Sequence, residues 1–288
     1  MPSPEPLANL DGRLLPLAEA RVSALDRGFL FGDGVYEVLR VYFGQPWLED
    51  AHFWRLERSL REIRIGGIDL DRLRRRMRET IAAGPFDEAI VYLQITRGSA
   101  PRAHVFPAAT TPLEFLFVQA FVDPYQDLRE QGADVITRPD VRWDRCDIKS
   151  LNRLANVLMA QEAKEAGCIE ALLYLADGTF TEGTHTSLMG VVQGTLASAP
   201  QGPGILPGTT RALIVAEAGR LGIPFKEQAL NWQELERLDE LFLTGTTSEV
   251  LPIARVDGRR IRDGRPGPVT RMLQKAYADA VAAFRRSG

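Results

Sequence analysis

Residues 26–43 spell DRGFLFGDGVYEVLRVYF, a glycine-rich stretch that leads into a run rich in β-branched and aromatic residues. The run at 35–43 lies between two glycines, which is the pattern of a β-strand. Further along, apolar residues recur at helical spacing in two segments that begin near Asp50 and Asp71, and these segments predict two helices. Two more apolar runs, separated by a proline-rich loop, predict strands at 89–97 and 113–121.

The second half of the chain mixes strands and helices without the regular alternation of a doubly wound parallel sheet. Asp123-Pro124 marks a break between the halves. We therefore predict an α+β protein with a smaller domain at 1–122 and a larger domain at 123–288. Asn9-Leu10-Asp11-Gly12 predicts a hairpin near the N-terminus. In the second half, strands are expected at 133–138, 169–176, 187–192 and 240–244, and helices at 152–166, 209–221 and 268–285.

Composition is that of a globular protein, since 45% of the 288 residues are hydrophobic and 25% are charged. The net charge of −3 lacks the basic excess of a nucleic-acid-binding domain, and no apolar run is long enough to span a bilayer. The first ten residues lack the features of a secretory signal. Two cysteines make neither a disulfide framework nor a zinc site. We expect a cytoplasmic enzyme or binding protein with no metal and no nucleic-acid or membrane partner.

Lysine is rare here, because only four of the 35 basic residues are lysines. Lys164 and Lys275 fall in polar helical stretches, and Lys226 follows the start of an apolar run. Lys149 alone lies among small, apolar and turn-forming residues where one predicted element gives way to the next. Burial there would lower the pKa of its amine below the usual value of about 10.4. Although most lysines are solvated surface residues, Lys149 is the candidate for a Schiff-base nucleophile.

The tripeptide Gly-Thr-Thr occurs twice, at 208–210 and 245–247. The first copy stands where a helix is predicted to begin, so backbone N–H groups, hydroxyls and the positive end of the helix dipole converge at Thr209 and Thr210. Ordinary N-capping explains one such turn, but two of them, with Thr246 in the second, favour a phosphate site. The chain has no G-x-x-x-x-G-K-[ST] motif, so a nucleoside triphosphate is not expected.

Glu182, Arg102 and His104 are further candidates. Glu182 lies in Thr181-Glu182-Gly183, where a surface acid is the ordinary interpretation. Beside an anchored aromatic cofactor, however, a carboxylate there would keep a pyridine nitrogen protonated. Arg102 and His104 stand two residues apart in a proline-flanked loop, so an extended loop presents both to one side. Such a pair can bind a substrate carboxylate through charge-assisted hydrogen bonds.

Together these motifs resemble the fold-type IV enzymes that depend on pyridoxal 5′-phosphate (PLP), and the match covers nearly the whole chain. The motifs are residues 26–37, Thr96-Arg97-Gly98, Arg102-Ala103-His104, residues 145–152, Thr181-Glu182-Gly183 and residues 246–249. Within the family, the Arg-x-His loop points to ping-pong transamination from a D-amino acid, such as D-alanine, to a 2-oxo acid, such as 2-oxoglutarate. A branched-chain L-amino-acid aminotransferase or an aminodeoxychorismate lyase is the alternative. A non-enzymatic binder of a phosphorylated ligand is the third hypothesis.

The resemblance also implies a role for each candidate residue. Lys149 binds PLP as a Schiff base and later moves the proton, and Glu182 pairs with the pyridine nitrogen. Leu206 packs against the ring, and the phosphate is bound by Arg55, Thr209, Thr210 and Thr246. The substrate carboxylate is held by Tyr36, Arg102 and His104, with the Arg-x-His loop supplied by the other subunit of a homodimer. PLP is expected at the interface of the two domains, with its lysine on the larger one.

Two positions depart from the resembling enzymes. Gly245 stands where those enzymes have a phosphate-binding serine, which leaves only a backbone N–H at this point of the turn. Thr184-His185-Thr186-Ser187 replaces a stretch that is richer in serine. The contacts at the phosphate and at the edge of the ring are therefore expected to differ in this chain.

Overall fold

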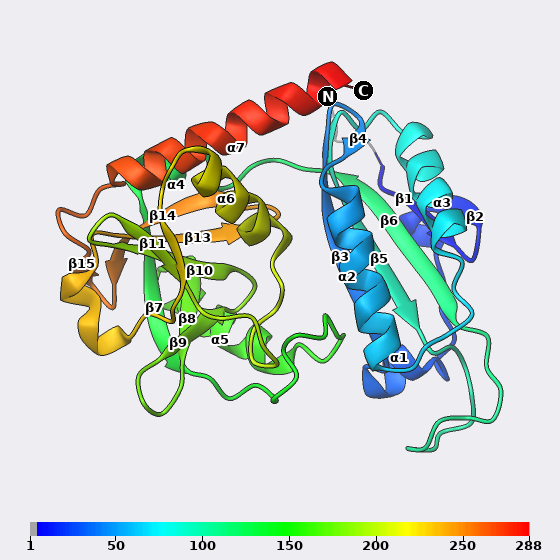
Figure 1. Cartoon of the computed structure of the whole chain (residues 1–288). Helices are drawn as coiled ribbons and strands as arrows, with labels where there is room; N and C mark the ends of the chain where they lie inside the picture. Colours follow the sequence, from blue (N-terminus) through cyan, green and yellow to red (C-terminus); the bar gives the residue numbers. More distant parts are fainter. Residues whose placement is uncertain (1–4, 288) are drawn as a thin grey trace. The chain divides into compact units, whose positions relative to one another are not determined.

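The computed structural model describes residues 5–287 and groups the chain into two compact units (Figure 1). Unit 1 comprises the residues up to Val122 together with Ile148–Asn152, and unit 2 comprises Asp123–Asp147 and Arg153–Ser287. The chain thus changes unit after Val122 and returns to unit 1 for the short segment that contains Lys149. Chain order assigns that segment to the predicted larger domain, whereas its contacts group it with unit 1.

Unit 1 is built on a six-stranded sheet in which the neighbours run antiparallel, in the order β2-β1-β6-β5-β3-β4. Its first two strands form the predicted hairpin, and Asp11 and Gly12 at its tip both have positive φ, as a tight hairpin turn requires. The predicted strand at 35–43 is β3. The strands are β1 (Leu7–Leu10), β2 (Arg13–Pro16), β3 (Gly34–Tyr42), β4 (Gln45–Pro46), β5 (Glu88–Thr96) and β6 (Leu113–Ala120).

The α-helices among the described residues of unit 1 are α1 (Arg27–Phe31), α2 (Glu49–Glu62) and α3 (Leu70–Ala82). Helix α2 packs on β3, and α3 packs on β1 and β6; Figure 1 shows α2 running along β3 and β5. Asp69 caps α3 by accepting a hydrogen bond from the backbone N–H of Arg72. The core joins Leu39, Phe53 and Met77 of β3, α2 and α3, and it also includes Ile148, the residue before Lys149.

Unit 2 contains a nine-stranded mixed sheet within the described part of the chain. Its path is β12-β11-β10-β13-β14-β7-β8-β9, and β15 pairs with β14. The pairs β11–β12, β14–β7 and β7–β8 are parallel, and the others are antiparallel. The strands are β7 (Ala133–Pro139), β8 (Glu170–Tyr174), β9 (Phe180–Gly183), β10 (Ser187–Val192), β11 (Thr195–Ser198), β12 (Phe225–Glu227), β13 (Glu240–Gly245), β14 (Glu249–Val256) and β15 (Arg259–Arg260).

The helices of unit 2 are α4 (Gln126–Gln131), α5 (Leu154–Glu165), α6 (Thr209–Arg220) and α7 (Pro268–Ser287). Helix α5 packs on β7 and β8, where Met159 and Ala163 are buried, and α6 and α7 pack on each other and on β13. Helices packed on separate sheets confirm the predicted α+β class. The sequence analysis missed strands β4, β9, β11, β14 and β15 and helices α1 and α4. Most of these are too short to show a period, but β14 has eight residues. No helix within residues 5–287 is long and apolar enough to span a membrane.

Candidate active site

Lys149 is fixed by its backbone to β3 and α2 of unit 1. Its carbonyl oxygen accepts a hydrogen bond from the backbone N–H of Tyr36 at 3.0 Å, and its own N–H donates to Ser59 Oγ of α2 at 3.2 Å. Ser150, next in the chain, forms a β-bridge with Val35. The Lys149 amine lies 4.6 Å from the centre of the Tyr36 ring. The structure thus brings together two of the predicted residues, Lys149 and Tyr36.

Tyr36 also begins an aromatic stack across the sheet. Its ring lies 5.7 Å from that of Tyr92 on β5, which in turn lies 5.2 Å from Phe117 on β6. Burial raises the pKa of Tyr92 to about 12, so its hydroxyl stays protonated and donates to Gln94 Oε1 at 2.8 Å. The sequence analysis missed Tyr92. The two-residue alternation of the predicted strand at 89–97, which sets Tyr92 and Gln94 on one face, is the signal that could have found it.

Arg55 is held in a buried cluster with Glu37 and His52. Its Nε and Nη2 atoms donate to the two Glu37 carboxylate oxygens, both at 2.7 Å, and His52 Nδ1 lies 2.7 Å from Glu37 Oε2. All three side chains are almost completely buried. Burial alone would raise the pKa of Glu37, but the charge and hydrogen bonds of Arg55 outweigh it and lower this pKa to about 2. Burial lowers the pKa of His52.

Glu37 and His52 are functional candidates that the sequence analysis did not single out. Glu37 shares the buried face of β3 with Val35 and Leu39. A carboxylate on the apolar face of a strand needs a cation, and that mismatch was a usable signal. The carboxylate fixes two of the three guanidinium nitrogens of Arg55, so the orientation of this predicted phosphate ligand is set by β3.

Arg102 and His104 lie together in the exposed loop after β5. Arg27 of α1 holds the loop by donating to the carbonyl oxygens of Ala103 at 2.6 Å and of His104 at 3.3 Å. The Phe31 ring lies 5.6 Å from the His104 ring and 5.3 Å from the Arg102 guanidinium carbon. The predicted pair therefore shares one anchor, helix α1.

The base of this loop is tied to the end of α2. Arg97 makes two hydrogen bonds to the Asp33 carboxylate, at 2.8 and 2.9 Å, and donates to the carbonyls of Ile63 and Arg64. Its guanidinium carbon lies 3.7 Å from the centre of the Phe106 ring. Burial favours a higher pKa for Asp33, but its arginine partners outweigh burial and lower this pKa. An ionised Asp33 thus fixes both the start of the loop and, through Arg27, its tip.

Glu182 lies in β9 of unit 2 and is buried rather than at the surface. Its Oε1 atom accepts a hydrogen bond from Arg142 Nη1 at 2.5 Å, and its Oε2 atom accepts one from the backbone N–H of Leu206 at 3.3 Å. Two predicted residues, Glu182 and Leu206, are thus neighbours. Burial raises the pKa of Glu182 above its usual range in spite of Arg142. The interpretation of Glu182 as a surface acid is wrong.

Arg142 joins Glu182 to a second carboxylate, Asp140. Its Nη2 atom donates to Asp140 Oδ2 at 2.7 Å, and the Thr181 hydroxyl donates to the same oxygen at 2.7 Å. The charge and hydrogen bonds of Arg142 lower the pKa of Asp140 although burial opposes them. Both residues lie in the charged segment after β7, where exposed and buried arginines look alike in the sequence, so Arg142 was missed.

The two Gly-Thr-Thr turns lie near each other in unit 2. The N-cap of α6 is Gly208, so neither Thr209 nor Thr210 is the capping residue that the ordinary interpretation expects. A Cβ atom on Gly208 would lie 2.5 Å from the hydroxyl of Ser187 on β10. Ser187 is paired across the sheet with Thr244, which precedes the second turn at 245–247. Strand β10 therefore connects the start of α6 with the turn that contains Thr246.

The stretch that replaces a serine-rich one is organised by buried Glu170 of β8. Glu170 Oε1 accepts hydrogen bonds from the Thr184 N–H at 3.0 Å and from the Thr184 hydroxyl at 2.5 Å, and its Oε2 accepts from the Thr186 hydroxyl at 2.9 Å. His185 Nδ1 lies 3.0 Å from the same carboxylate. Both threonine hydroxyls are thus engaged within unit 2.

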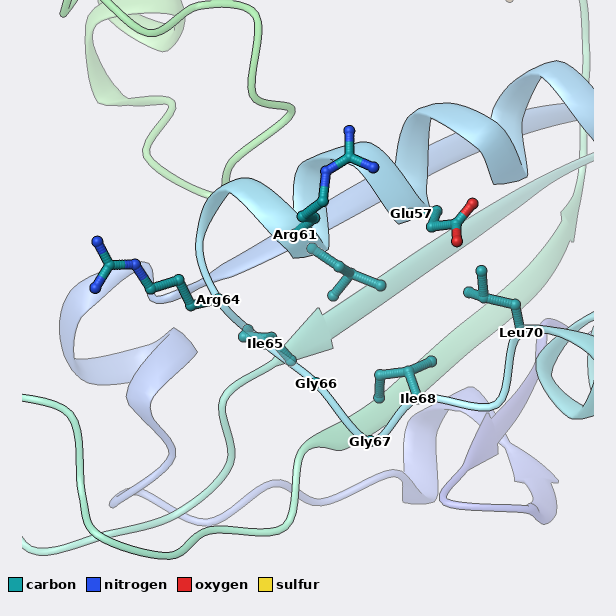
Figure 2. A pocket seen from close by; sticks show the side chains of 9 residues that line it. Glu57, Arg61, Arg64, Ile65, Gly66, Gly67, Ile68 and Leu70 are labelled. Atoms are coloured by element: carbon teal, nitrogen blue, oxygen red, sulfur yellow. The ribbon is translucent and has the colours of Figure 1, made fainter.

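Two surface pockets are lined by other residues. One, of about 490 Å³, is formed in unit 1 by the end of α2 and the loop to α3 (Figure 2). There Ile68 and Leu70 face the helix end, and Arg61 and Arg64 extend outward. The other, of about 250 Å³, lies in unit 2 against Asp140 and Arg142. None of the predicted site residues lines either pocket.

The chain and its fold have clear counterparts among known proteins. The family described as amino-transferase class IV matches residues 34–256. This chain belongs to the class IV aminotransferases. A D-alanine aminotransferase from Bacillus licheniformis is 39% identical over 275 residues, which cover 94% of this chain and 95% of that enzyme. A D-alanine aminotransferase from Staphylococcus haemolyticus is 37% identical over 270 residues and covers 93% of this chain and 95% of its own length.

Solved structures agree with this membership. The branched-chain amino acid aminotransferase of Escherichia coli superposes with a TM-score of 0.89 at 26% identity, over 96% of this chain and 94% of that one. The branched-chain aminotransferase of Thermoproteus uzoniensis, solved with norvaline, has a TM-score of 0.85 at 28% identity, over 96% of this chain and 94% of its own. Another branched-chain enzyme, solved with pyridoxamine 5′-phosphate, has a TM-score of 0.87 at 25% identity over the same shares of the two chains. The fold-type IV prediction is therefore confirmed.

Proposed function

We propose that this class IV aminotransferase transfers the amino group of D-amino acids, such as D-alanine, to a 2-oxo acid, such as 2-oxoglutarate. The observation that carries the proposal is the match over more than nine-tenths of the chain to enzymes named D-alanine aminotransferase, at 37–39% identity. The branched-chain enzymes of similar fold are less similar, at 25–28% identity. Arg102 and His104, which both contact Phe31 of α1 from the loop after β5, support the same choice.

The residues present fit PLP, the cofactor of this family. The chain offers a lysine amine for the aldehyde, a buried carboxylate for the pyridine nitrogen, and a hydroxyl-rich helix start for the phosphate. Bound PLP supplies an electron sink that stabilises negative charge at the substrate Cα. We propose that Lys149, Glu182, Leu206, Arg55, Thr209, Thr210 and Thr246 serve one PLP molecule.

Lys149 would hold the cofactor covalently and, once released, move the proton from the substrate Cα. Both tasks need a lysine whose backbone is fixed, because a small displacement of the amine would lower the rate strongly. The backbone of Lys149 is bonded on both sides, to Tyr36 and to Ser59, and Ile148 is buried in the core. The cationic amine over the Tyr36 ring is at the same time close to a group that would bind substrate.

Glu182 would keep a proton on the pyridine nitrogen. For this the Glu182 carboxyl must be ionised, and the charge and hydrogen bonds of Arg142 oppose the rise in its pKa that burial causes. Arg142 donates one hydrogen bond to Oε1 and the Leu206 N–H donates one to Oε2, and each oxygen can accept another. Arg142 would thus position Glu182 through its contact, without itself touching the cofactor.

The substrate carboxylate would be held by Tyr36, Arg102 and His104. A guanidinium and an imidazole in one exposed loop can both donate to one carboxylate, and a charge-assisted bond is about twice as strong as a neutral one. We propose, as the family resemblance implies, that this loop serves the active site of the other subunit in a homodimer. We also propose a cytoplasmic location, since both cysteines are free thiols.

Comparing D- and L-amino acids as amino donors is the experiment that decides which reaction the enzyme catalyses. Purified enzyme should use D-alanine with 2-oxoglutarate, and L-leucine should be a poor donor. Preference for L-leucine would instead establish branched-chain aminotransferase activity, the activity named for the E. coli enzyme of similar fold. Elimination without transfer of the amino group would indicate a lyase, and a protein that binds phosphate without either reaction would be a simple binder.

A second experiment tests the lysine. Borohydride reduction followed by peptide mapping should place the cofactor on Lys149, and Lys149→Ala should abolish transamination. Lys164→Ala is the matched control, because Lys164 is an exposed lysine of α5. Cofactor attached to another residue, or normal turnover in Lys149→Ala, would refute this assignment.

A further inference from the structure

The second Gly-Thr-Thr turn is flanked by two buried hydroxyls that lack a partner. Thr244 Oγ1, before the turn, and Ser248 Oγ, after it, make no hydrogen bond to any residue that the structure describes. The two residues are only 2% and 1% exposed. A buried hydroxyl without a hydrogen bond costs free energy, and native proteins rarely leave one. These atoms therefore indicate a ligand for the turn.

The Ser248 hydroxyl lies where the side chain of residue 245 would start. A Cβ atom on Gly245 would stand 2.7 Å from Ser248 Oγ, and the next nearest atom, Thr186 Cγ2, would be 3.4 Å away. A contact of 2.7 Å is too short for a real Cβ atom. The glycine therefore leaves room that the Ser248 hydroxyl takes, so a hydroxyl is present at this point of the turn although residue 245 has none.

Arg129 of α4 holds the backbone of the same turn. Its Nε donates to the Ser248 carbonyl at 3.2 Å, and its Nη2 donates to the Thr247 carbonyl at 3.3 Å. Glu249, the next residue, has a φ of 57°, which is uncommon for a residue other than glycine, and lies 3.4 Å from Arg129 Nε. A turn fixed at two carbonyls is set before any ligand binds, which reduces the entropy cost of binding.

We infer that Ser248 Oγ donates a hydrogen bond to the phosphate of PLP and takes the place that Gly245 leaves. The inference rests on the proposed function, because it assumes that the phosphate binds at the two Gly-Thr-Thr turns. It goes beyond the predicted set of Arg55, Thr209, Thr210 and Thr246 by adding a fifth ligand. The N-terminus of α6, connected through Ser187 to the same turn, supplies the positive end of a helix dipole.

The test compares PLP with pyridoxal, which has the same ring and aldehyde but no phosphate. Each is titrated into apoprotein freed of PLP, and binding is followed by cofactor absorbance and protein fluorescence. Ser248→Ala should weaken PLP binding about 10- to 100-fold, the range for a lost hydrogen bond to a charged group, and leave pyridoxal binding unchanged. The Tm of the apoprotein should not fall, because the variant removes an unpartnered hydroxyl. Thr270→Val, which removes another buried unpartnered hydroxyl on α7, is the matched control and should change neither affinity.

Moving the hydroxyl back gives a second arm. Gly245→Ser alone should weaken PLP binding because its Cβ collides with Ser248 Oγ, and Gly245→Ser combined with Ser248→Ala should restore it. Wild-type PLP affinity in Ser248→Ala, equal losses of PLP and pyridoxal, or no recovery in the combined variant would each overturn the inference. A wild-type apoprotein that binds PLP no better than pyridoxal would instead refute the phosphate site of the proposed function itself.

Discussion

Glu37→Gln should destabilise unit 1 much more than its small change in shape suggests. The amide keeps the size of the carboxylate but removes the negative charge that faces the buried Arg55 guanidinium. Removing one partner of a buried ion pair costs about 3–5 kcal/mol. The expected outcome is therefore a large loss in the free energy of unfolding of unit 1.

The lowered pKa of Glu37, which has the same cause, corresponds to a similar free energy. Folding lowers this pKa from 4.5 to about 2, a change that corresponds to about 3 kcal/mol of preference for the ionised carboxyl. Because the folded protein holds fewer protons on Glu37 than the unfolded chain, this stabilisation is complete above the unfolded pKa. It is lost as the pH falls through the folded pKa. His52 acts in the same direction, since its pKa is also lowered.

Hydrogen exchange measured by mass spectrometry resolves the two units in one experiment. Peptides of α2 and β3 in Glu37→Gln should exchange about two orders of magnitude faster than in the wild type. Peptides of unit 2 serve as an internal reference. Asp50→Asn on the same helix is the matched control, because Asp50 pairs with Arg74 while its own side chain is almost fully exposed, and such pairs contribute little.

Two results would refute the reasoning. The first is exchange in α2 and β3 that is no faster in Glu37→Gln than in Asp50→Asn. The second concerns acid: urea unfolding should show the gap between the wild type and Glu37→Gln narrowing from about pH 6 to about pH 3, because acid removes from the wild type the charge that the variant already lacks. A gap that stays constant would contradict the lowered pKa of Glu37.

Three further substitutions test the proposed site. Arg142→Met removes the cation that counteracts the effect of burial on the pKa of Glu182, so this pKa should rise further. The acid limb of the pH profile of kcat should then move to higher pH. An unchanged acid limb would show that Arg142 does not influence the ionisation that turnover requires. Arg102→Ala should lower kcat/KM for D-alanine by about one to two decades while PLP affinity in equilibrium titration is unchanged; an unaltered kcat/KM would remove Arg102 from the substrate site. Glu182→Gln should slow single-turnover transamination but leave binding of inorganic phosphate to the apoprotein unaffected, and full speed would contradict its contact with the pyridine nitrogen.

Local pattern was enough to predict most of the elements of this fold. The β-branched and aromatic content of β3 and the helical spacing on α2 and α3 predict these three elements, and Leu39, Phe53 and Met77 on them lie in one core. Those patterns can be detected within a short segment of sequence, because a strand or a helix buries one face along its own length. Short strands such as β9 have too few residues to show a period, so Glu182 was expected at a turn and lies in a strand.

Residues that act through a distant partner could not be found in this way. Glu37 meets Arg55 across 18 positions, and Arg142 meets Glu182 across 40. Before folding, each is one charged residue among many, and only pairing of the elements makes it a buried ion pair. The Ser248 hydroxyl beside Gly245 belongs to the same class, since three positions of chain separation do not reveal which side of a turn a side chain takes.

The amino-acid sequence by itself determined the chemical inventory of this protein: one lysine at an element junction, a glutamate before a glycine, two Gly-Thr-Thr turns and an Arg-x-His loop. Tertiary structure alone decided which of these groups are buried, what holds them and how their pKa values move. It also decided that Lys149 is packed with the first unit although it follows the start of the second. The physical reason is that reactivity depends on solvation and on neighbours in space, and neither is a property of adjacent residues.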